Sequence, residues 1–157
     1  HKVLVSITDE LQNRKQILRT AGVANIDEYN RNAEKKLYRI VFACDEIAEV
    51  LDKTGLSKQQ KDEILKIESE LSIIARQGRA FGIHLVLATQ RPDATILNGQ
   101  IRNNIDTRIC GRADNVLSQI ILDNTDASDK IAKSSQGRFL TNSGKIFQAY
   151  WFDENIL

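Results

Sequence analysis

The sequence has 157 residues, and its 22 Lys and Arg nearly balance 21 Asp and Glu, giving a formal net charge of +1 at pH 7. Hydrophobic residues make up 41% and charged residues 27%, values close to the average for globular domains, and a chain this long buries roughly two thirds of the surface of its unfolded form. These values exclude a disordered segment, an acidic tail and a protein that binds nucleic acid across a broad basic surface.

The cysteines, the apolar runs and the first residue indicate in which compartment the chain lies and whether it is part of a longer protein. Cys44 and Cys110 each lie in an apolar run typical of a buried strand, and we expect both to be free thiols in a reducing cytosol. No apolar run approaches the roughly twenty residues of a membrane-spanning helix, so we expect a cytoplasmic chain without membrane contact. The sequence contains no methionine and opens on His1, which indicates part of a longer protein.

Apolar periodicity predicts helices and strands in alternation, beginning with a helix. Residues Val3 to Ala21 carry apolar side chains at helical spacing, and Gly22 is placed to end that helix. A further turn or two of helix is expected around Ile26 to Asn30. Tyr38 to Cys44 is a run of β-branched and aromatic residues, which predicts a strand covered on both faces.

The middle of the chain predicts a long helix and a second strand. Asp52 to Asp62 is the most polar stretch, and we expect a loop there that leads into an amphipathic helix capped by Ser57. The apolar face of this helix consists of Ile64, Ile67, Leu71, Ile74 and Ala75. Ile83 to Thr89 predicts a second covered strand, and Ile96 to Asn104 predicts another helix.

The last third of the chain predicts a strand over Thr107 to Cys110 and a helix over Ala113 to Leu122. Gly137 to Thr141 and Ile146 to Phe152 flank the turn-forming residues Asn142 to Gly144, which predicts an antiparallel hairpin. Strands separated by helices require parallel crossovers. The expected fold is therefore α/β, with a mostly parallel central sheet flanked by helices and a C-terminal antiparallel hairpin, in one domain.

Two adjacent carboxylates, Asp45 and Glu46, follow the first predicted strand. Ligands of parallel sheets collect beyond the carboxyl ends of the strands. An apolar strand followed by Asp-Glu is the Walker B pattern of P-loop ATPases, in which Asp45 would hold Mg²⁺, directly or through water. Glu46 would orient the water that attacks the γ-phosphate. A strand that ends in a solvated acidic turn would present the same two residues.

Polar residues also end the next predicted strand, where Thr89 and Gln90 precede Pro92. A polar side chain beside a Walker B strand can detect the γ-phosphate of bound ATP. Gln90 suits this role because its amide can donate to phosphate and accept from water, and Thr89 could share it by contacting the nucleotide. The alternative is a strand end that uses polar residues to enter a turn.

The phosphate-binding loop of such an ATPase, G-x-x-x-x-G-K-[ST], is absent from the sequence. The only Gly-Lys pair is Gly144-Lys145, with Phe139 where the first glycine is required and Ile146 where Ser or Thr is required. Either the acidic pair has no catalytic role or the phosphate-binding loop lies before His1. The missing initiator favours the second alternative.

Together these motifs resemble the FtsK/SpoIIIE family of DNA translocases. The resemblance covers most of the chain, and its most specific part is Ile74 to Pro92, which contains A-R-Q-G-R-A-F-G-I-H-L and ends in T-Q-R-P. Ile40 to Glu46 is similar to the Walker B strand of the family. Further similar stretches are Ala21 to Val23, Asn25 to Asn30, Ile101 to Ile109 and Ser118 to Asp123.

The resemblance implies a RecA-like P-loop ATPase domain that assembles as a homo-hexameric ring and pumps double-stranded DNA through its centre. ATP and Mg²⁺ would bind between subunits, where an arginine of one subunit completes the site of the next. Candidates for this arginine finger are Arg14, Arg76, Arg79, Arg108 and Arg112. We favour Arg14. The loop from Pro92 through Asn104, with Arg91 and Arg102 nearby, is the candidate for contact with DNA phosphates.

Three functions are compatible with these motifs. The first is DNA translocation, either in chromosome partition at the inner face of the cell membrane or in transfer of a conjugative or integrative element. The length of Asp52 to Lys66 and the sequence Cys44 to Glu46 favour the mobile element. The alternatives are a type VII protein-secretion ATPase and a degenerate subunit that does not hydrolyse ATP. Without a phosphate-binding loop, this part alone is expected to be monomeric and inactive.

Overall fold

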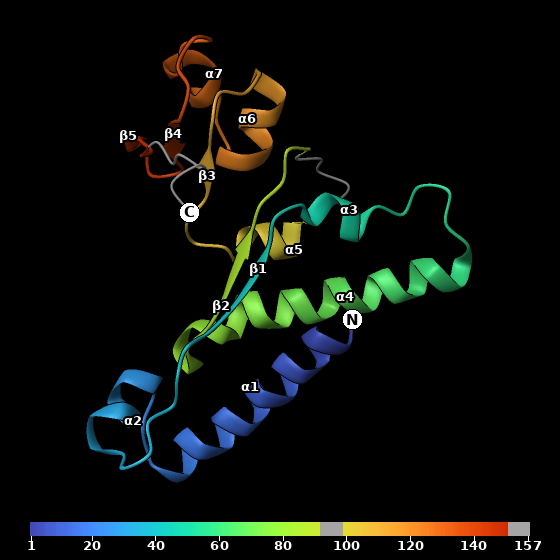
Figure 1. The fold of residues 1–157 in the computed structure, drawn as a ribbon. Helices are drawn as coiled ribbons and strands as arrows, with labels where there is room; N and C mark the ends of the chain where they lie inside the picture. Colours follow the sequence, from blue (N-terminus) through green and yellow to red (C-terminus); the bar gives the residue numbers. More distant parts are fainter. Residues whose placement is uncertain (92–98, 151–157) are drawn as a thin grey trace, which may run out of the picture. The chain divides into compact units, whose positions relative to one another are not determined.

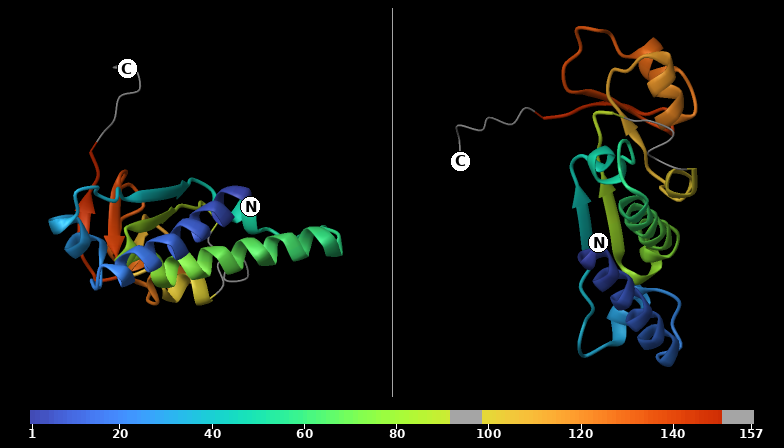
Figure 2. Two further views of the ribbon diagram at one scale, coloured as in Figure 1. Left: turned by 90° about the horizontal axis from the view of Figure 1, so that it is seen from below. Right: turned by 90° about the vertical axis from the view of Figure 1, so that its right-hand side faces the viewer.

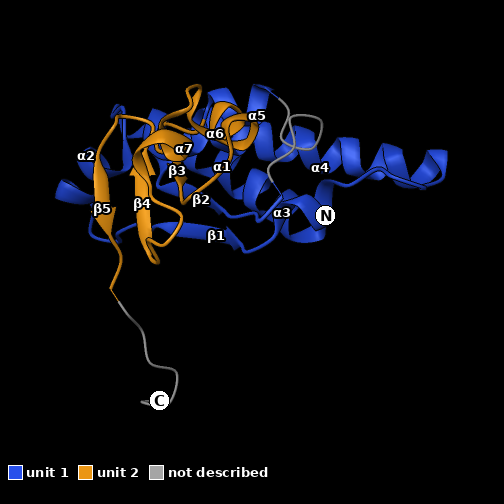
Figure 3. Ribbon diagram, turned by 90° about the horizontal axis from the view of Figure 1, so that it is seen from above, with its two compact units in different colours: residues 1–91, 96–104 blue, residues 92–95, 105–157 orange. Residues whose placement is uncertain are grey.

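The structure, a computed structural model, describes residues 1–91 and 99–150. The chain divides into two compact units, which comprise residues 1–91 with 96–104 and residues 92–95 with 105–157 (Figure 3). Each unit has its own sheet and its own helices, and each is described by itself. That residues 1–157 act as part of one motor domain stays a prediction.

The first unit opens with two helices whose ends follow from the sequence. α1 covers Lys2–Thr20 and buries the apolar side chains that its periodicity predicts. Gly22 follows this helix in the left-handed conformation, with φ of 67°, which glycine adopts without strain. α2 covers Ile26–Asn32, and the side chain of Asn25 caps it by accepting a hydrogen bond of 3.0 Å from the backbone N–H of Glu28.

β1 (Ile40–Cys44) and β2 (Ile83–Leu87) form a parallel pair, which confirms the predicted crossover (Figure 1). The register pairs the first residues of the two strands and also their last residues, so both strands end at the same edge. The connection between them contains α3 (Ile47–Leu51), α4 (Lys58–Gln77) and the short 3₁₀ helix η1 (Gly78–Phe81). The predicted polar loop therefore ends where α4 begins.

α4 begins at the predicted cap. The Ser57 side chain accepts a hydrogen bond from the Gln60 backbone N–H, and the Gln60 side chain accepts one from the Ser57 backbone N–H. α4 lies beside α1 (Figure 2), and the Thr8 hydroxyl donates to the Glu70 carboxylate across the two helices at 2.5 Å. α5 (Gly99–Asn103) and β2 also contact α4.

The sheet of the first unit is covered on one face in the described residues. Burial alternates along β1, with Phe42 half-buried and Val41 60% exposed, and Val86 on β2 is 54% exposed. The prediction of strands covered on both faces is therefore wrong for the described part of the chain. The reason is that this sheet has two strands there and takes its helical cover from one side. Within the described residues, no helix has the length and apolar character to cross a membrane.

The second unit contains β3 (Ile109–Cys110), α6 (Asn115–Leu122), α7 (Asp126–Lys130), β4 (Arg138–Thr141) and β5 (Ile146–Gln148). β4 and β5 are the predicted antiparallel hairpin, and β3 pairs with β4 in antiparallel orientation. The third strand thus belongs to the hairpin sheet, whereas strand–helix alternation predicts that it joins the parallel one. A two-residue strand carries too little pattern to indicate its partner.

The core of the second unit is small and apolar, with one buried hydroxyl. It consists of Cys110, Leu122, Ala127, Ile131 and Leu140. Ser118 is fully buried, and its hydroxyl donates to the Asn124 carbonyl at 2.7 Å and accepts from the Ala127 N–H at 3.1 Å. Both cysteines are free thiols, as predicted, and burial raises the pKa of the Cys110 thiol.

Parts of three predicted elements lie outside the described residues. These parts are residues 96–98 of the predicted helix, residues 151 and 152 of the hairpin, and the beginning of the loop at Pro92.

Gly78 leads to a prediction about how η1 meets β2. A Cβ atom on Gly78 would lie 2.5 Å from the Ile83 carbonyl oxygen, a backbone atom that cannot turn away. Helix propensity favours alanine over glycine, so only this close approach opposes the substitution. We expect Gly78→Ala to lower the free energy of unfolding by about 1–3 kcal/mol in urea denaturation. Gly99→Ala is the control, because a Cβ there meets nothing closer than 3.9 Å, and equal stabilities of the two variants would contradict the prediction.

Candidate active site

Four of the predicted site residues lie just beyond the ends of β1 and β2, namely Asp45, Glu46, Thr89 and Gln90. The backbone N–H of Ala88 donates to the Cys44 carbonyl at 2.8 Å, and that of Ile47 donates to the Ala88 carbonyl at 2.9 Å. These two hydrogen bonds continue the strand pairing past the last ladder residues. They place the segment at Glu46 beside the segment at Thr89, as the parallel sheet predicts.

The Glu46 carboxylate is held by both segments. Its Oε1 accepts hydrogen bonds from the Thr89 hydroxyl at 2.5 Å and from the Ala48 backbone N–H at 3.1 Å. Its Oε2 accepts from the Gln90 backbone N–H at 2.9 Å. Glu46 also caps α3 through the contact with Ala48. The carboxylate therefore has a fixed orientation at the strand ends.

These contacts favour the ionised form of Glu46. The Thr89 hydroxyl has the largest effect in lowering the pKa of the Glu46 carboxyl, followed by the Gln90 N–H, with smaller contributions from the Ala48 N–H and the Arg91 charge. Arg91 also lowers the pKa of Asp52, where hydrogen bonds from Thr54 dominate. An ionised carboxylate is the form that can accept a proton from water.

Asp45 has the position and chemistry expected of a Mg²⁺ ligand. It is exposed, directly after β1 and next to Glu46. In the described part of the chain, no group of three or more His, Cys, Asp or Glu side chains could hold a metal ion. Mg²⁺ is commonly bound through one or two carboxylates, with water and phosphate oxygens as the other ligands. Asp45 fits that mode of binding.

The two polar residues that follow β2, Thr89 and Gln90, differ in their contacts. The hydroxyl of Thr89 donates to Glu46 and accepts from the Arg91 backbone N–H at 3.0 Å. Gln90 binds Glu46 through its backbone, and the residue is exposed. The sequence predicts nucleotide contacts for both residues, and its motifs do not indicate that Thr89 binds Glu46. The parallel register of the two strands could have indicated this contact, because it brings Thr89, two residues beyond the end of β2, beside the segment that follows β1.

Arg14, the favoured arginine finger, is buried within the first unit. It is 4% exposed, its Nε donates to the Glu10 carboxylate at 2.7 Å, and its Nη1 donates to the Phe81 carbonyl at 2.9 Å. The hydrogen bond from Arg14 lowers the pKa of Glu10. These contacts join α1 to η1. In this position the guanidinium contacts only groups of its own chain among the described residues. That Arg14 acts as an arginine finger stays a prediction, and it requires Arg14 to leave these contacts.

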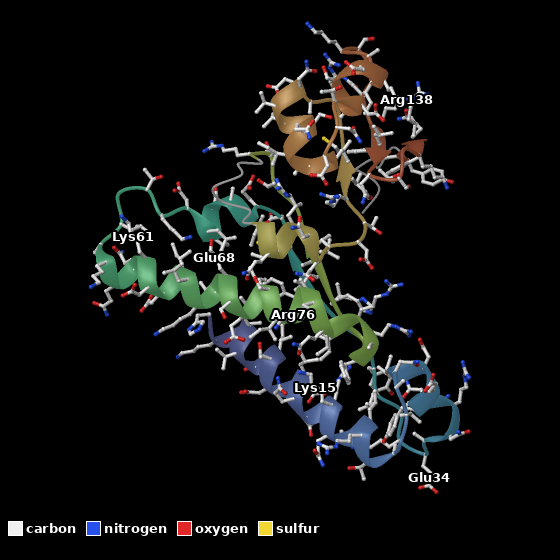
Figure 4. The ribbon with its side chains drawn as sticks, turned by 180° about the vertical axis from the view of Figure 1, so that it is seen from behind. Lys15, Glu34, Lys61, Glu68, Arg76 and Arg138 are labelled. Carbon is white, nitrogen blue, oxygen red and sulfur yellow. The ribbon has the colours of Figure 1, made fainter. Side chains whose placement is uncertain are left out.

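The other candidate arginines have different surroundings. Arg76 on α4 is exposed (Figure 4), and Arg112 donates to the Ser128 and Ile131 carbonyls within the second unit. Arg108 forms an ion pair of 2.7 Å with Asp123.

The two candidates for contact with DNA differ in exposure. Arg91 is exposed and lies four residues after the end of β2, whereas Arg102 on α5 is half-buried. Of the predicted DNA-contacting loop from Pro92 through Asn104, residues 92–98 lie outside the described residues, and Gly99–Asn103 form α5.

An ion pair between the buried Glu68 of α4 and the partly exposed Lys53 is a feature that the sequence did not predict. Glu68 lies on the buried side of α4 (Figure 4) and forms an ion pair of 2.7 Å with Lys53 from the preceding loop. An open hollow of about 420 Å³ borders the same helix. It is lined by Leu65, Glu68, Ser69, Ser72, Ile73, Gln100 and the arginine-finger candidate Arg76.

The burial of Arg14 leads to a stability prediction. Arg14→Gln removes two charge-assisted hydrogen bonds, one to the Phe81 carbonyl and one to Glu10 Oε1. We expect a loss of about 1–3 kcal/mol in the free energy of unfolding, measured by urea denaturation. Arg76→Gln is the matched control, because Arg76 is exposed, and it should change stability by less than about 0.5 kcal/mol. Wild-type stability of Arg14→Gln would show that the buried contacts are dispensable.

Comparison with known proteins gives a consistent assignment. No protein-family model matches the sequence. The DNA translocase FtsK of Chlorobaculum tepidum is 33% identical over 145 residues, which cover 91% of this chain and 16% of that protein. FtsK of Chlamydia pneumoniae is 34% identical over 135 residues, which cover 82% of this chain and 17% of that protein. The chain thus spans a small part of these relatives.

Two solved structures resemble this chain over 99% and 92% of its length. TcpA, the coupling protein of pCW3 conjugation, was solved as a monomer with ATPgS; it is 41% identical with a TM-score of 0.90, over 99% of this chain and 45% of that one. The type VII secretion ATPase EccC of Thermomonospora curvata has a TM-score of 0.66 at 22% identity, over 92% of this chain and 16% of that one, a likeness that shows the fold alone. The expected RecA-like P-loop ATPase fold is thus confirmed. The sequence and the fold together show that the chain belongs to the FtsK/SpoIIIE family of P-loop ATPases.

Proposed function

We propose that this chain is the later part of an ATP-driven motor that moves double-stranded DNA, within a longer protein. The observation that carries the proposal is the Glu46 carboxylate, held in one orientation at the end of β1 by hydrogen bonds from Thr89 and Gln90. The identity to FtsK proteins and to a conjugation coupling protein supports DNA as the substrate. The likeness to TcpA also supports a role in conjugative transfer over one in chromosome partition.

The residues of this chain would supply the part of the active site that orients the attacking water and binds Mg²⁺. Glu46 would orient the attacking water, Asp45 would bind Mg²⁺, and Gln90 would contact the γ-phosphate. When bound, ATP would supply the phosphoryl group, and Mg²⁺ would neutralise the charge that develops on it. The chain does not supply the phosphate-binding loop, since its Gly144-Lys145 pair lies at the turn between β4 and β5. A segment elsewhere in the longer protein must therefore hold the phosphates.

The ring and its DNA contacts complete the proposal. A homo-hexamer would bring an arginine of the neighbouring subunit to the site. Among the five candidates, exposed Arg76 is available to a neighbour as it stands, whereas Arg14 is not. Arg91 and Arg102 would contact DNA phosphates, which needs only a few local cations and agrees with the net charge of +1.

Glu46→Gln tests the catalytic role in a longer form of the protein that includes the phosphate-binding segment. The amide keeps the size of the side chain but cannot accept a proton, so ATP binding should persist while hydrolysis falls by about 100-fold or more. Steady-state ATPase assays and equilibrium binding of a fluorescent ATP analogue measure the two effects. Glu49→Gln, an exposed acid in the same short helix, is the control and should keep wild-type activity. Unchanged turnover in Glu46→Gln would remove Glu46 from catalysis.

Arg91→Gln tests the DNA contact and separates DNA from polypeptide as the substrate. Loss of one phosphate contact should weaken duplex binding at every sequence and reduce the slope of log affinity against log salt by about 1. Arg39→Gln is the control, since Arg39 is exposed and pairs with Asp27 near the opposite end of β1. Binding of a secretion-signal peptide, with no salt-dependent duplex binding by the wild type, would favour the type VII alternative instead.

A further inference from the structure

The hydrogen bonds that the Glu46 carboxylate accepts within residues 1–91 and 99–150 leave one of its acceptor positions free. A carboxylate offers about four acceptor positions, two on each oxygen. In this structure Oε1 accepts from the Thr89 hydroxyl and the Ala48 N–H, which fills both of its positions. Among the described residues, Oε2 accepts a hydrogen bond from the Gln90 N–H alone. The remaining acceptor position is therefore on Oε2.

The direction of the Thr89 hydroxyl is determined by its second contact. Its Oγ1 accepts a hydrogen bond of 3.0 Å from the Arg91 backbone N–H. The hydroxyl proton is consequently free to point to Glu46, and the Oγ1–Oε1 distance of 2.5 Å agrees with a charge-assisted hydrogen bond. The β-branched side chain of Thr89 restricts rotation about χ1, which makes it a stiff support.

We propose that Thr89 is a positioning residue for ATP hydrolysis: it holds Glu46 Oε1 so that the free acceptor position on Oε2 meets the attacking water. The proposal rests on the proposed function, because it presumes that Glu46 acts on water. In this role the Thr89 hydroxyl binds Glu46 and not the nucleotide. Because the carboxylate is rigid, donors that hold one of its oxygens in place also fix the direction of the other oxygen. A fixed acceptor can then hold the attacking water in one orientation.

Amide hydrogen exchange tests the positioning in this chain, without nucleotide. Thr89→Val keeps the shape of the side chain but lacks the hydroxyl, and Thr89→Ser keeps the hydroxyl. We expect exchange at the Gln90 and Ala48 amides, which donate to Glu46, to become about threefold to tenfold faster in Thr89→Val and to stay at the wild-type rate in Thr89→Ser. The Ala88 amide, which donates to the Cys44 carbonyl, is the internal control.

Two results would overturn the positioning. One is wild-type exchange at Gln90 in Thr89→Val while its Ala88 amide stays protected. The other is equally fast exchange in Thr89→Ser. Fast exchange of the Ala88 amide in Thr89→Val would show that this substitution disturbs the strand pairing. Thr89→Ala, which lacks the hydroxyl and adds no second methyl group, is then used in place of Thr89→Val, and the same outcomes are expected.

ATPase kinetics of the longer protein test the consequence for catalysis. Loss of the positioning hydroxyl should lower kcat by about tenfold or more with little change in KM, and Thr89→Ser should restore kcat to within about threefold of the wild type. A raised KM with unchanged kcat would instead show that Thr89 binds nucleotide. If the wild type hydrolyses no ATP, the proposed function fails, whereas the exchange result still decides whether Thr89 positions Glu46.

Discussion

The parallel pairing of β1 and β2 is the constraint on which the candidate active site depends. Its register joins Cys44 to Leu87, and the hydrogen bonds that follow keep the chain aligned as far as Ile47 and Ala88. Two segments that are 43 residues apart in sequence thereby meet as Glu46 and Thr89. A shift of one residue would turn the side chains of one strand to the opposite face and break this contact. The geometry of the site is thus a consequence of the sheet.

Packing around this sheet explains why a charged residue can be buried in α1. The chain leaves α4 through η1 and enters β2 at Gly82, which has φ of 72°. At that turn the Phe81 carbonyl points to Arg14, whose guanidinium satisfies both this carbonyl and the Glu10 carboxylate. Arg14 therefore joins the first helix to the start of the second strand. A buried guanidinium is stable only with such partners.

Local patterns predicted most of the secondary structure, and long-range contacts account for what they missed. The β-branched run of β1 and the Ser57 cap of α4 depend on neighbouring residues, so the sequence alone was sufficient. The burial of Arg14 depends on Phe81, 67 residues away, and the partner of β3 lies in a hairpin further along the chain. The Walker B motif alone predicted the roles of Asp45 and Glu46. It did not predict the hydrogen bond from Thr89 to Glu46, because that contact depends on the register of two strands.

In the proposed motor, Glu46, held by Thr89, orients the water for ATP hydrolysis. The most direct measurement is a crystal structure of the longer protein in its assembled form with a non-hydrolysable ATP analogue. We expect a water in line with the γ-phosphate and about 2.6–3.2 Å from Glu46 Oε2, while Oε1 still accepts from the Thr89 hydroxyl. A water in that position held by another side chain, with Glu46 turned away from it, would contradict the account.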